Sequence, residues 1–359
     1  MLRIFHPIGQ GAFYSERHNN FNIVYDCGEW KKSKKSTELV KNSFEPNSTI
    51  DILFISHFDY DHISQIETLK NNFKIKRCIL PVVSSEQKKI LVAFFRCFNW
   101  ASVIKLVENP SAFFGEETKI IYVEEVKKEG EENNNEKVVD LENEQSGSHI
   151  ESGKRISISD WLYIPYNNYL KERYDELKKE FQILGLDVTK FKNDIDYCID
   201  NKKTIKEAYN RLTGGINSNS MMVYSGPIDK NLYYIKRLYY GLSPVDCKKC
   251  LLFKEIFETP SGCIFTGDSN LGDVLPFYLK YHDRVGTIQL PHHGSAKSFD
   301  FDFLRKKNEY LLYFPTSYGS KNSYGHPAQN VVCNVVKSRS YFIHITEQAY
   351  TTFIQYIAR

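Results

Sequence analysis

Short apolar runs separated by turn residues dominate the first quarter of the chain. Runs rich in Ile, Val, Phe and Tyr and bounded by Gly, Asp or Asn are typical of buried strands. Four such runs occupy residues 2–8, 21–28, 51–56 and 76–81. Residues 63–73 and 85–98 instead have apolar positions at helical spacing, and Ser85 is a candidate cap for the second of these helices.

The same alternation returns in the second half of the chain. Strands are predicted at residues 160–166, 218–225, 250–255, 262–268, 285–291, 310–317 and 341–346. A helix is predicted at residues 270–281 despite Pro276, and no tandem repeat is present. Because strands and helices alternate in both halves, the pattern favours a compact α/β domain over a string of small modules.

Two central segments depart from this pattern. Residues 124–156 are polar, acidic and rich in Asn, Gly and Ser, which predicts a flexible insertion with little to bury. Residues 165–215 have helical periodicity and end at Gly214-Gly215, which predicts a helical insertion. These helices are either a cap or a surface for a protein partner. The whole chain, residues 1–359, is then expected to be a single domain interrupted by these two insertions.

Composition narrows the class of protein. The 359 residues are 42% hydrophobic, enough for a sizeable core, and the net charge of +3 gives no general basic field.

No basic-then-apolar leader opens the sequence and no apolar run approaches a membrane span, so we expect a soluble, cytoplasmic protein with reduced thiols. Cys247 and Cys250 lack a second pair, which argues against a structural zinc. Aromatic residues make up 14%, but a stacking platform for bases would require clustering that a sequence does not show.

The stretch SHFDYDHIS, residues 56–64, carries the strongest chemical signal. Two carboxylates are costly to bury without cations. An extended segment places alternate side chains on one side, so His57, Asp59 and Asp61 can point together, while His62 opens the following helix. This loop follows an apolar strand, where sites collect in α/β folds, and could supply two metal ions.

Further candidate ligands follow later strands. Each has an ordinary alternative, because an Asp can cap a helix and a Gly-His-Pro sequence is often only a turn. The ordered set is nevertheless much less expected by chance than any single member. These candidates are Asp268 in FTGD, His292, His293 and Ser295 in LPHHGSAKS, and Asn322 and His326 in SYGSKNSYGHP.

Together these motifs resemble the metallo-β-lactamase superfamily of hydrolases. HFDYDH is similar to its His-x-His-x-Asp-His signature, with Asp59 in place of the middle His. That variant resembles the branch that contains the hydrolase domain of ComEC-type DNA-uptake proteins and the phosphorylcholine esterases. The other motifs of this branch occur in the same order: IGQGAF, NIVYDCG, NSNSMMVYS, FTGD, LPHHGSAKS and SYGSKNSYGHP.

The resemblance implies an αββα sandwich with the metal ions at the edge between two sheets. It implies one metal held by His57 and Asp59, a second held by Asp61, His62 and His293, and Asp268 as the bridging ligand. It also implies four substrate-facing residues: His292, Ser295, Asn322 and His326. His326 would be a proton donor or an anion contact, and the choice between His292 and His293 as the ligand stays open.

Two departures from the family pattern bear on the metal. Many members have a further ligating His between the first motif and the bridging Asp, whereas this chain has only His149 in that interval. The first site is therefore poor in nitrogen ligands, which makes Mn²⁺ as well as Zn²⁺ a candidate for the two divalent ions. The usual Gly-Gly after the first motif is Ser64-Gln65 here, which affects local packing rather than chemistry.

The predicted function is metal-dependent hydrolysis, most simply by a phosphodiesterase or nuclease that uses a metal-bridged hydroxide. Asp61, Asp268 and His326 are the predicted catalytic residues. The expected partner is a nucleic acid or a small phosphodiester, with Lys297, Lys321 and the segment around Arg237 as candidates for a basic path. The alternatives are a hydrolase of a small phosphoester, ester or amide, and an interaction module with a vestigial metal site.

Overall fold

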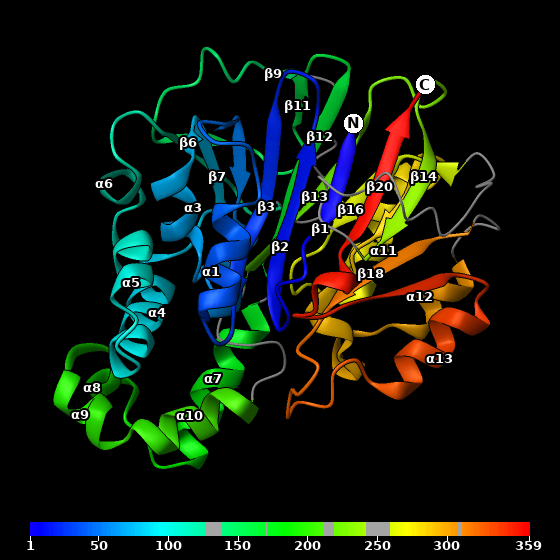
Figure 1. The fold of residues 1–359 in the computed structure, drawn as a ribbon. Coiled ribbons are helices and arrows are strands. Elements are labelled where there is room, and N and C mark those ends of the chain that lie inside the picture. The colour runs from blue at the N-terminus through cyan, green and yellow to red at the C-terminus, as the bar shows by residue number, and fades with distance from the viewer. Residues whose placement is uncertain (127–137, 170, 212–218, 242–258, 307–310) are drawn as a thin grey trace.

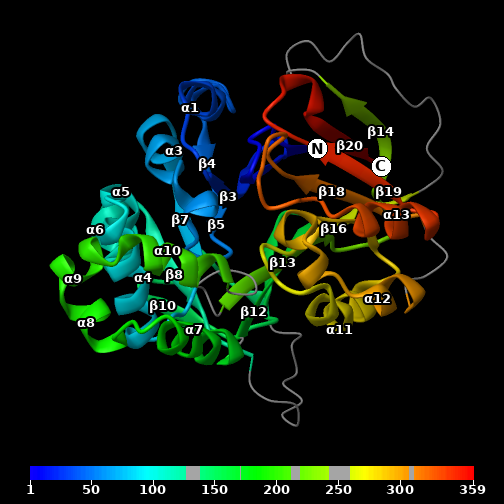
Figure 2. The ribbon, with the colours of Figure 1, turned by 90° about the horizontal axis from the view of Figure 1, so that it is seen from below.

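Two β-sheets pack face to face and helices cover both outer faces (Figure 1). This computed structural model describes residues 1–126, 138–169, 171–211, 219–241, 259–306 and 311–359. Seen from below, helices lie on either side of the paired sheets (Figure 2). The predicted αββα sandwich is therefore confirmed.

The first sheet has ten strands. In spatial order they are β10 (Ser148–Ile150), β8 (Lys119–Val123), β7 (Arg77–Pro81), β5 (Ile52–Phe54), β3 (Asn22–Glu29), β2 (Gly11–Arg17), β1 (Leu2–Phe5), β20 (Phe353–Ala358), β14 (Tyr234–Tyr240) and β15 (Thr259–Pro260). Strands β3, β5, β7 and β8 run parallel, and β1, β2 and β20 pair antiparallel. A separate short pair joins β4 (Thr49–Ile50) and β6 (Lys74–Ile75).

The second sheet has eight strands. In spatial order they are β19 (Tyr341–Ile345), β18 (Tyr313–Ser317), β17 (Val285–Ile288), β16 (Gly262–Phe265), β13 (Asn219–Pro227), β12 (Trp161–Tyr169), β11 (Arg155–Ile158) and β9 (Val138–Val139). Strands β16 to β19 run parallel. The segments that follow β5, β16, β17 and β18 leave the carboxyl ends of parallel strands, which is where α/β folds collect functional loops.

Helices form the outer layers. Those on the side of the first sheet are α1 (Lys34–Lys41), α3 (Ile66–Asn72), α4 (Ser85–Cys97), α5 (Ala101–Glu108) and α6 (Pro110–Phe114). Further out, α8 (Val188–Asn193) and α9 (Ile195–Asp200) pack against α4, and α7 (Lys171–Ile183) packs against α10 (Lys202–Arg211). Those on the second sheet are α11 (Leu271–Tyr281), α12 (Phe301–Lys306) and α13 (Gln329–Lys337). A one-turn helix, α2 (Tyr60–Ile63), and the 3₁₀ turns η1 (Pro291–Gly294), η2 (Ala296–Ser298) and η3 (Ala349–Thr351) lie in loops.

Alternation along the strands produces three apolar layers. On β3, Ile23 and Tyr25 face the other sheet while Val24 faces the helices. The layer between the sheets also buries Phe5 and Phe265. Each sheet is thus covered on both faces, which is why so many of its strands read as continuous apolar runs rather than as alternating ones.

The sequence-based expectations differ from the structure at a few places. The segment 124–156 was predicted to be a flexible insertion with little to bury. Its described residues 138–156 instead join the sheets through β9, β10 and the start of β11, and they bury Leu141 and Ile150. Helix α4 is capped by Ser84 rather than Ser85, since the Ser84 side chain accepts the Gln87 N–H.

Other expectations fall beyond the part of the chain that the structure describes. The predicted strand at 250–255, the Cys247–Cys250 pair and Gly214-Gly215 lie outside the described residues. The domain limits stay a prediction. Within the described ranges, no helix combines the length and apolar character needed to cross a bilayer.

Candidate metal centre

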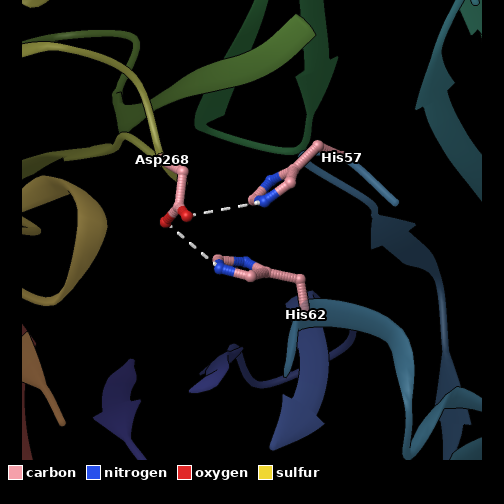
Figure 3. A group of neighbouring side chains, drawn as sticks. All are labelled: His57, His62 and Asp268. Carbon is pink, nitrogen blue, oxygen red and sulfur yellow. Dashed lines mark ion pairs between the residues drawn. The ribbon is translucent and has the colours of Figure 1, made fainter. Parts of the chain in front are cut away.

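Loops from both sheets converge on two overlapping clusters of buried side chains. The ligand atoms of His57, His62 and Asp268 lie within 4.8 Å of one another, and so do those of Asp61, His62 and His293. Figure 3 shows Asp268 facing the rings of His57 and His62. His62 belongs to both clusters, so residues from β5–α2, from the turn after β16 and from the turn after β17 meet at one point.

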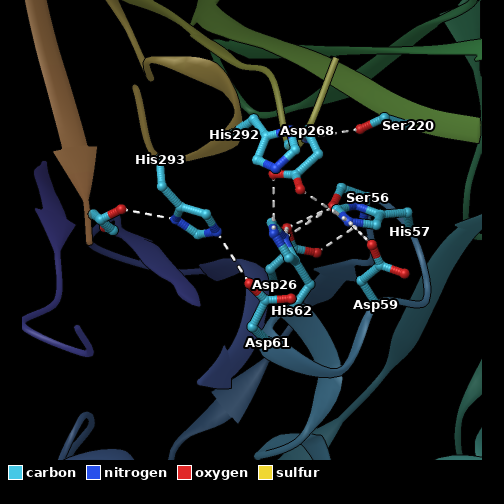
Figure 4. Close-up of polar contacts among 12 residues, drawn as sticks. Asp26, Ser56, His57, Asp59, Asp61, His62, Ser220, Asp268, His292 and His293 are labelled. Atoms are coloured by element: carbon cyan, nitrogen blue, oxygen red, sulfur yellow. Dashed lines mark hydrogen bonds and ion pairs between the residues drawn. The ribbon is translucent and has the colours of Figure 1, made fainter. Parts of the chain in front are cut away.

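Asp26 and Ser56 fix the orientation of two imidazoles (Figure 4). Asp26 accepts hydrogen bonds from the Ser56 N–H at 2.7 Å, the Ser56 hydroxyl at 2.6 Å and His62 Nδ1 at 2.8 Å. Because the Ser56 hydroxyl donates to Asp26, its oxygen is left to accept from His57 Nδ1 at 2.8 Å. Both rings therefore carry their proton on Nδ1 and direct Nε2 into the cluster, which is the arrangement of a metal-ligating His and its supporting carboxylate.

A β-bulge places Asp26. In the β2–β3 pair, Phe13 lies opposite Cys27 and Tyr14 opposite Tyr25, so Asp26 is the extra residue of β3. Its φ of 54° lies in the left-handed region, which a non-glycine residue adopts at some cost. Bulges re-aim a side chain out of the regular alternation, and here the bulge turns a fully buried carboxylate towards the loop of His57 and His62.

The turn that carries Asp268 is held from two sides. The Asp268 N–H donates to Ser220 Oγ at 3.0 Å, and the Gln289 side chain accepts the N–H groups of Thr266 and Gly267 at 2.8 and 3.0 Å. Gly267 has a φ of +55°, and a Cβ there would lie 2.8 Å from the Cβ of Ser56. This close approach requires glycine, and it brings the turn of one sheet against the loop of the other.

His293 is fixed in the same way as His62. Its Nδ1 donates to the Ser317 carbonyl at 2.8 Å, and its Nε2 lies 3.0 Å from Asp61 Oδ2. His292 and His293 both have positive φ, at 48° and 54°, so the turn after β17 is held in a conformation that side-chain-bearing residues rarely adopt. Strain of this kind concentrates at functional sites, where the surroundings impose it.

Gly11 and Gly28, from the first two motifs, allow the 56–64 loop to pack closely on the first sheet. A Cβ on Gly28 would come within 2.6 to 2.7 Å of backbone atoms of Asp61, His62 and Ile63. A Cβ on Gly11 would lie 2.7 Å from the Asp61 carbonyl oxygen. Helix α2 thus packs its backbone directly on β2 and β3, which gives the IGQGAF and NIVYDCG motifs a physical reason.

The positions of protons and lone pairs on the two imidazoles show whether a cation fits the clusters. His62 and His293 each commit Nδ1–H to a protein acceptor, so Nε2 is left to face a carboxylate, at 3.2 Å from Asp268 and 3.0 Å from Asp61. A lone pair facing a carboxylate requires either a proton or a metal ion between them. Buried His62 Nε2 moreover makes no hydrogen bond with any described residue. The donor set fits a divalent cation.

Proton binding in the protein without a metal follows from the same geometry. Burial alone would lower the pKa of His62, but Asp268 and Asp26 raise it well above 6.5. Burial also lowers the pKa of His293, but Asp61 and Asp268 outweigh burial and raise it. Burial raises the pKa of Asp268, yet the nearby His292, His62 and His57 outweigh burial and hold that pKa well below 3.8. A metal ion would replace these shared protons.

The remaining predicted site residues lie around the clusters. Asp59 Oδ2 is 3.7 Å from His57 Nε2, close to the first cluster but outside both groups. The ring centre of His326 lies 5.5 Å from that of His292 and 6.3 Å from that of His293. Figure 4 shows His292 beside Asp268, while His293 belongs to the second cluster.

Asn322 holds together the loop that precedes α13. Its Oδ1 accepts the N–H groups of Tyr324 and His326, and its Nδ2 donates to the carbonyls of Gly319 and His326. These hydrogen bonds use both ends of the amide, so Asn322 shapes the loop that carries His326. Ser295 is buried and its Oγ accepts the Lys297 N–H, which starts the turn η2. The ligand and substrate roles themselves stay predictions.

Three positioning residues were not predicted from the sequence: Asp26, Ser56 and Gln289. Asp26 and Ser56 lie within recognised motifs but had no role assigned to them. An Asp at the end of the apolar run FNIVY is a signal that could have been used, because an unpaired buried carboxylate is costly. Gln289 gave no comparable signal, since its function depends on the path of a turn in a neighbouring strand.

A comparison with known families agrees with this geometry. Residues 12–94 match the family model described as the Metallo-beta-lactamase superfamily. This range runs from β2 to α4 and includes the bulge at Asp26 and the whole 56–64 loop. The chain has the metallo-β-lactamase fold. The match supports the superfamily and does not single out the ComEC-type branch.

Two solved structures resemble this chain distantly. A long-form RNase Z from yeast has a TM-score of 0.40 and 10% identity, covering 90% of this chain and 38% of its own length. The short form of human tRNase Z (ELAC1) has a TM-score of 0.36 and 9% identity, covering 98% of each chain. This chain thus spans less than half of the yeast structure. At these scores nothing about activity follows from either likeness. Among curated proteins, none matches the sequence.

Proposed function

We propose that this protein is a metal-dependent phosphodiesterase or nuclease. The supporting observation is that Nε2 of His62 and Nε2 of His293 each lie 3.0 to 3.2 Å from a carboxylate oxygen. The Nδ1–H of each ring already donates to another acceptor. A buried His–Asp ion pair that only stabilises the fold needs one proton shared between the two side chains. It does not require a second acceptor that fixes the proton of the ring on Nδ1. Repetition of the pattern in two clusters that share His62 supports a site for two divalent ions.

The residues that would hold the ions divide between the clusters. His57 and Asp268, with Asp59 nearby, would serve the first, and Asp61 and His293 the second, while His62 belongs to both. The family resemblance gives Asp268 the role of bridging ligand. Divalent cations in such a site supply Lewis acidity and lower the pKa of water towards about 7. The first cluster combines its two imidazoles with the carboxylate of Asp268 and has that of Asp59 nearby, and this mixed donor set keeps Mn²⁺ beside Zn²⁺ as a candidate.

The protein side chains around the clusters have separable tasks. Burial, His293 and His292 lower the pKa of His326 to about 4, so its imidazole is neutral at physiological pH. Its buried Nδ1 makes no hydrogen bond with any residue the structure describes. A neutral ring beside the clusters can donate one N–H hydrogen bond to a substrate oxygen and accept a proton at its other nitrogen. Lys297 and Lys321 are exposed on the loops that carry His293 and His326, where they can contact a phosphate.

Phosphodiesters suit this site better than esters or amides. Their negative charge is attracted by cations and lysines, and their hydrolysis needs no protein nucleophile when water is activated. The HFDYDH motif, which resembles the ComEC-type branch, points to the same substrate class. An amide or neutral ester would make no use of Lys297 and Lys321.

The test compares metal content and hydrolysis in matched variants. Wild-type protein loaded with Mn²⁺ or Zn²⁺ should hydrolyse bis(p-nitrophenyl) phosphate and single-stranded DNA. Asp268→Asn should lose activity at least about 100-fold and bind less metal. Asp51→Asn changes another buried carboxylate, which pairs with Lys76, and should retain both properties. Metal-loaded wild type without phosphodiesterase activity, or full activity in Asp268→Asn, would refute the proposal.

A further inference from the structure

A continuous strip of aromatic rings leads to the clusters. Tyr60 stands between Asp59 and Asp61, and its ring stacks on Trp100 at 3.9 Å and 21°. The Phe98 ring also stacks on Trp100, with ring centres 5.1 Å apart. We define the aromatic strip as Phe98, Trp100, Tyr60, Trp30 and Tyr324. Its members come from the α4–α5 turn, the start of α2, the end of β3 and the loop before α13.

The strip ends beside the proposed catalytic residues. Trp30 contacts Trp100 at 6.0 Å and Tyr324 at 6.2 Å, both edge to face. The Tyr324 ring is 6.0 Å from His326, which lies against His292 and His293. The strip therefore runs from the helical layer across the metal loop to the clusters. Ring geometry alone would also suit a core, so exposure decides between the two interpretations.

The strip is open on one side. Tyr60, Phe98 and Trp100 pack one side against the core but remain half-buried, and Trp30 is half-buried as well. Tyr324 is 44% exposed. Large aromatic surface beside a reactive centre is uncommon in a monomer without a binding role. Aromatic faces of this kind stack nucleobases, because every base offers a π-face.

Positive charge flanks the strip. Lys31, Lys32, Lys34 and Lys35 follow Trp30 directly and are exposed. Among the described residues, Lys31, Lys32 and Lys34 form no ion pair. At the other end, Lys202 Nζ lies 5.1 Å from the centre of the Phe98 ring. Bases need stacking surface and phosphates need cations, and this surface offers both together.

We propose that the aromatic strip stacks the bases of a single-stranded nucleic acid and so guides its backbone to the clusters. This inference deepens the proposed function, on which its catalytic meaning rests. A duplex keeps its bases stacked internally and cannot use the strip without unpairing. A small phosphodiester without a base would gain nothing from it. The charge of the lysine run favours nucleic acid over an apolar protein segment.

Tryptophan fluorescence reports stacking directly. Of the three tryptophans, Trp30 and Trp100 belong to the strip and Trp161 is 1% exposed between the sheets. In EDTA, where metal-dependent hydrolysis is stopped, oligodeoxythymidylate should quench the emission. An abasic oligomer of equal length presents the same phosphates and should quench much less. Equal quenching and equal affinity for both oligomers would overturn the proposal.

Variants separate stacking from packing. Trp30→Leu and Tyr324→Leu should each weaken binding of the oligonucleotide about tenfold by fluorescence anisotropy, while Tyr324→Phe keeps the ring and the affinity. Tyr341→Leu is the matched control, because Tyr341 on β19 is 43% exposed and its ring stacks on Tyr313, outside the strip. Equal bound Mn²⁺ in all four variants shows that the clusters are intact.

The outcomes distinguish this inference from the proposed function. Wild type that binds the oligonucleotide through the strip but hydrolyses no phosphodiester with metal refutes the function and leaves the strip standing. Hydrolysis with unchanged binding in Trp30→Leu and Tyr324→Leu refutes the strip alone. Wild type that binds no oligonucleotide also refutes the strip and leaves a small phosphodiester as the substrate.

Discussion

Replacement of Asp26 by Asn tests how the clusters are built. Asp26 accepts from the Ser56 N–H, the Ser56 hydroxyl and His62 Nδ1 at 2.6 to 2.8 Å. An amide has the same shape but offers one acceptor and one donor. If its NH₂ faces His62, the ring must carry its proton on Nε2 instead of Nδ1. The nitrogen that faces Asp268 then can no longer bind a cation.

The size of the effect follows from the groups left unsatisfied. Either orientation of the amide opposes one buried donor to another, which costs about 1–3 kcal/mol. Since about 1.4 kcal/mol is tenfold in affinity, Asp26→Asn should weaken metal binding about 10- to 100-fold. The loss concerns metal affinity more than folding, because the substitution conserves volume in a fully buried position.

The assay is competition for Mn²⁺ or Zn²⁺ against a chelator of known affinity, followed by activity at saturating metal. Asp51→Asn makes the same chemical change at a buried carboxylate that accepts from the Asn22 N–H and Lys76, and serves as the control. An affinity in Asp26→Asn equal to wild type, or an equal loss in Asp51→Asn, would show that Asp26 does not set the His62 tautomer.

Three further outcomes are expected. Gly28→Ala should cost about 1–3 kcal/mol in urea unfolding and reduce bound metal, because its Cβ would meet the backbone of α2, whereas Gly272→Ala on α11, which meets only Asp300 at 3.2 Å, should be neutral. Adding Mn²⁺ at about 100 times its Kd should stabilise wild type by about 2.7 kcal/mol in the same assay, and EDTA should abolish the gain. Burial raises the pKa of Glu16, but Arg3, His18 and Ser225 outweigh it and lower the pKa from 4.5 to about 2. The resulting stability of about 3 kcal/mol should be fully present above pH 4.5 and lost as the pH falls towards 2, and a flat wild-type-minus-Glu16→Gln difference in unfolding free energy over that range would contradict this.

Apolar patterning predicted most of the strands, because strands covered on both faces read as continuous apolar runs. Those at β1, β5, β7, β17 and β18 lie within the predicted ranges. The short strands of 138–158 were not predicted, since β9 and β10 hold only a few residues and depend on pairing with β11 and β8. Composition described that segment correctly as polar, but its three buried apolar side chains, Leu141, Ile150 and Ile156, join the core.

The site was partly predictable for a related reason. Ligand types that are costly to bury stand out in a sequence, so the amino-acid pattern nominates His57, Asp59, Asp61, His62, Asp268 and the pair His292–His293. Residues that orient them do not stand out. Asp26 acts because a bulge turns it inwards and Ser56 because it relays a hydrogen bond, and both depend on register between strands. The aromatic strip likewise required three-dimensional proximity of segments far apart in the sequence.

The proposed function depends on whether the two His/Asp clusters jointly hold divalent cations. Anomalous diffraction from crystals grown with Mn²⁺ answers this question without any assay of activity. We expect two anomalous peaks, one against His57 and Asp268 and one against Asp61 and His293, with His62 Nε2 in contact with at least one. Absence of anomalous density at both clusters, with the side chains still converged, would contradict a metal centre here.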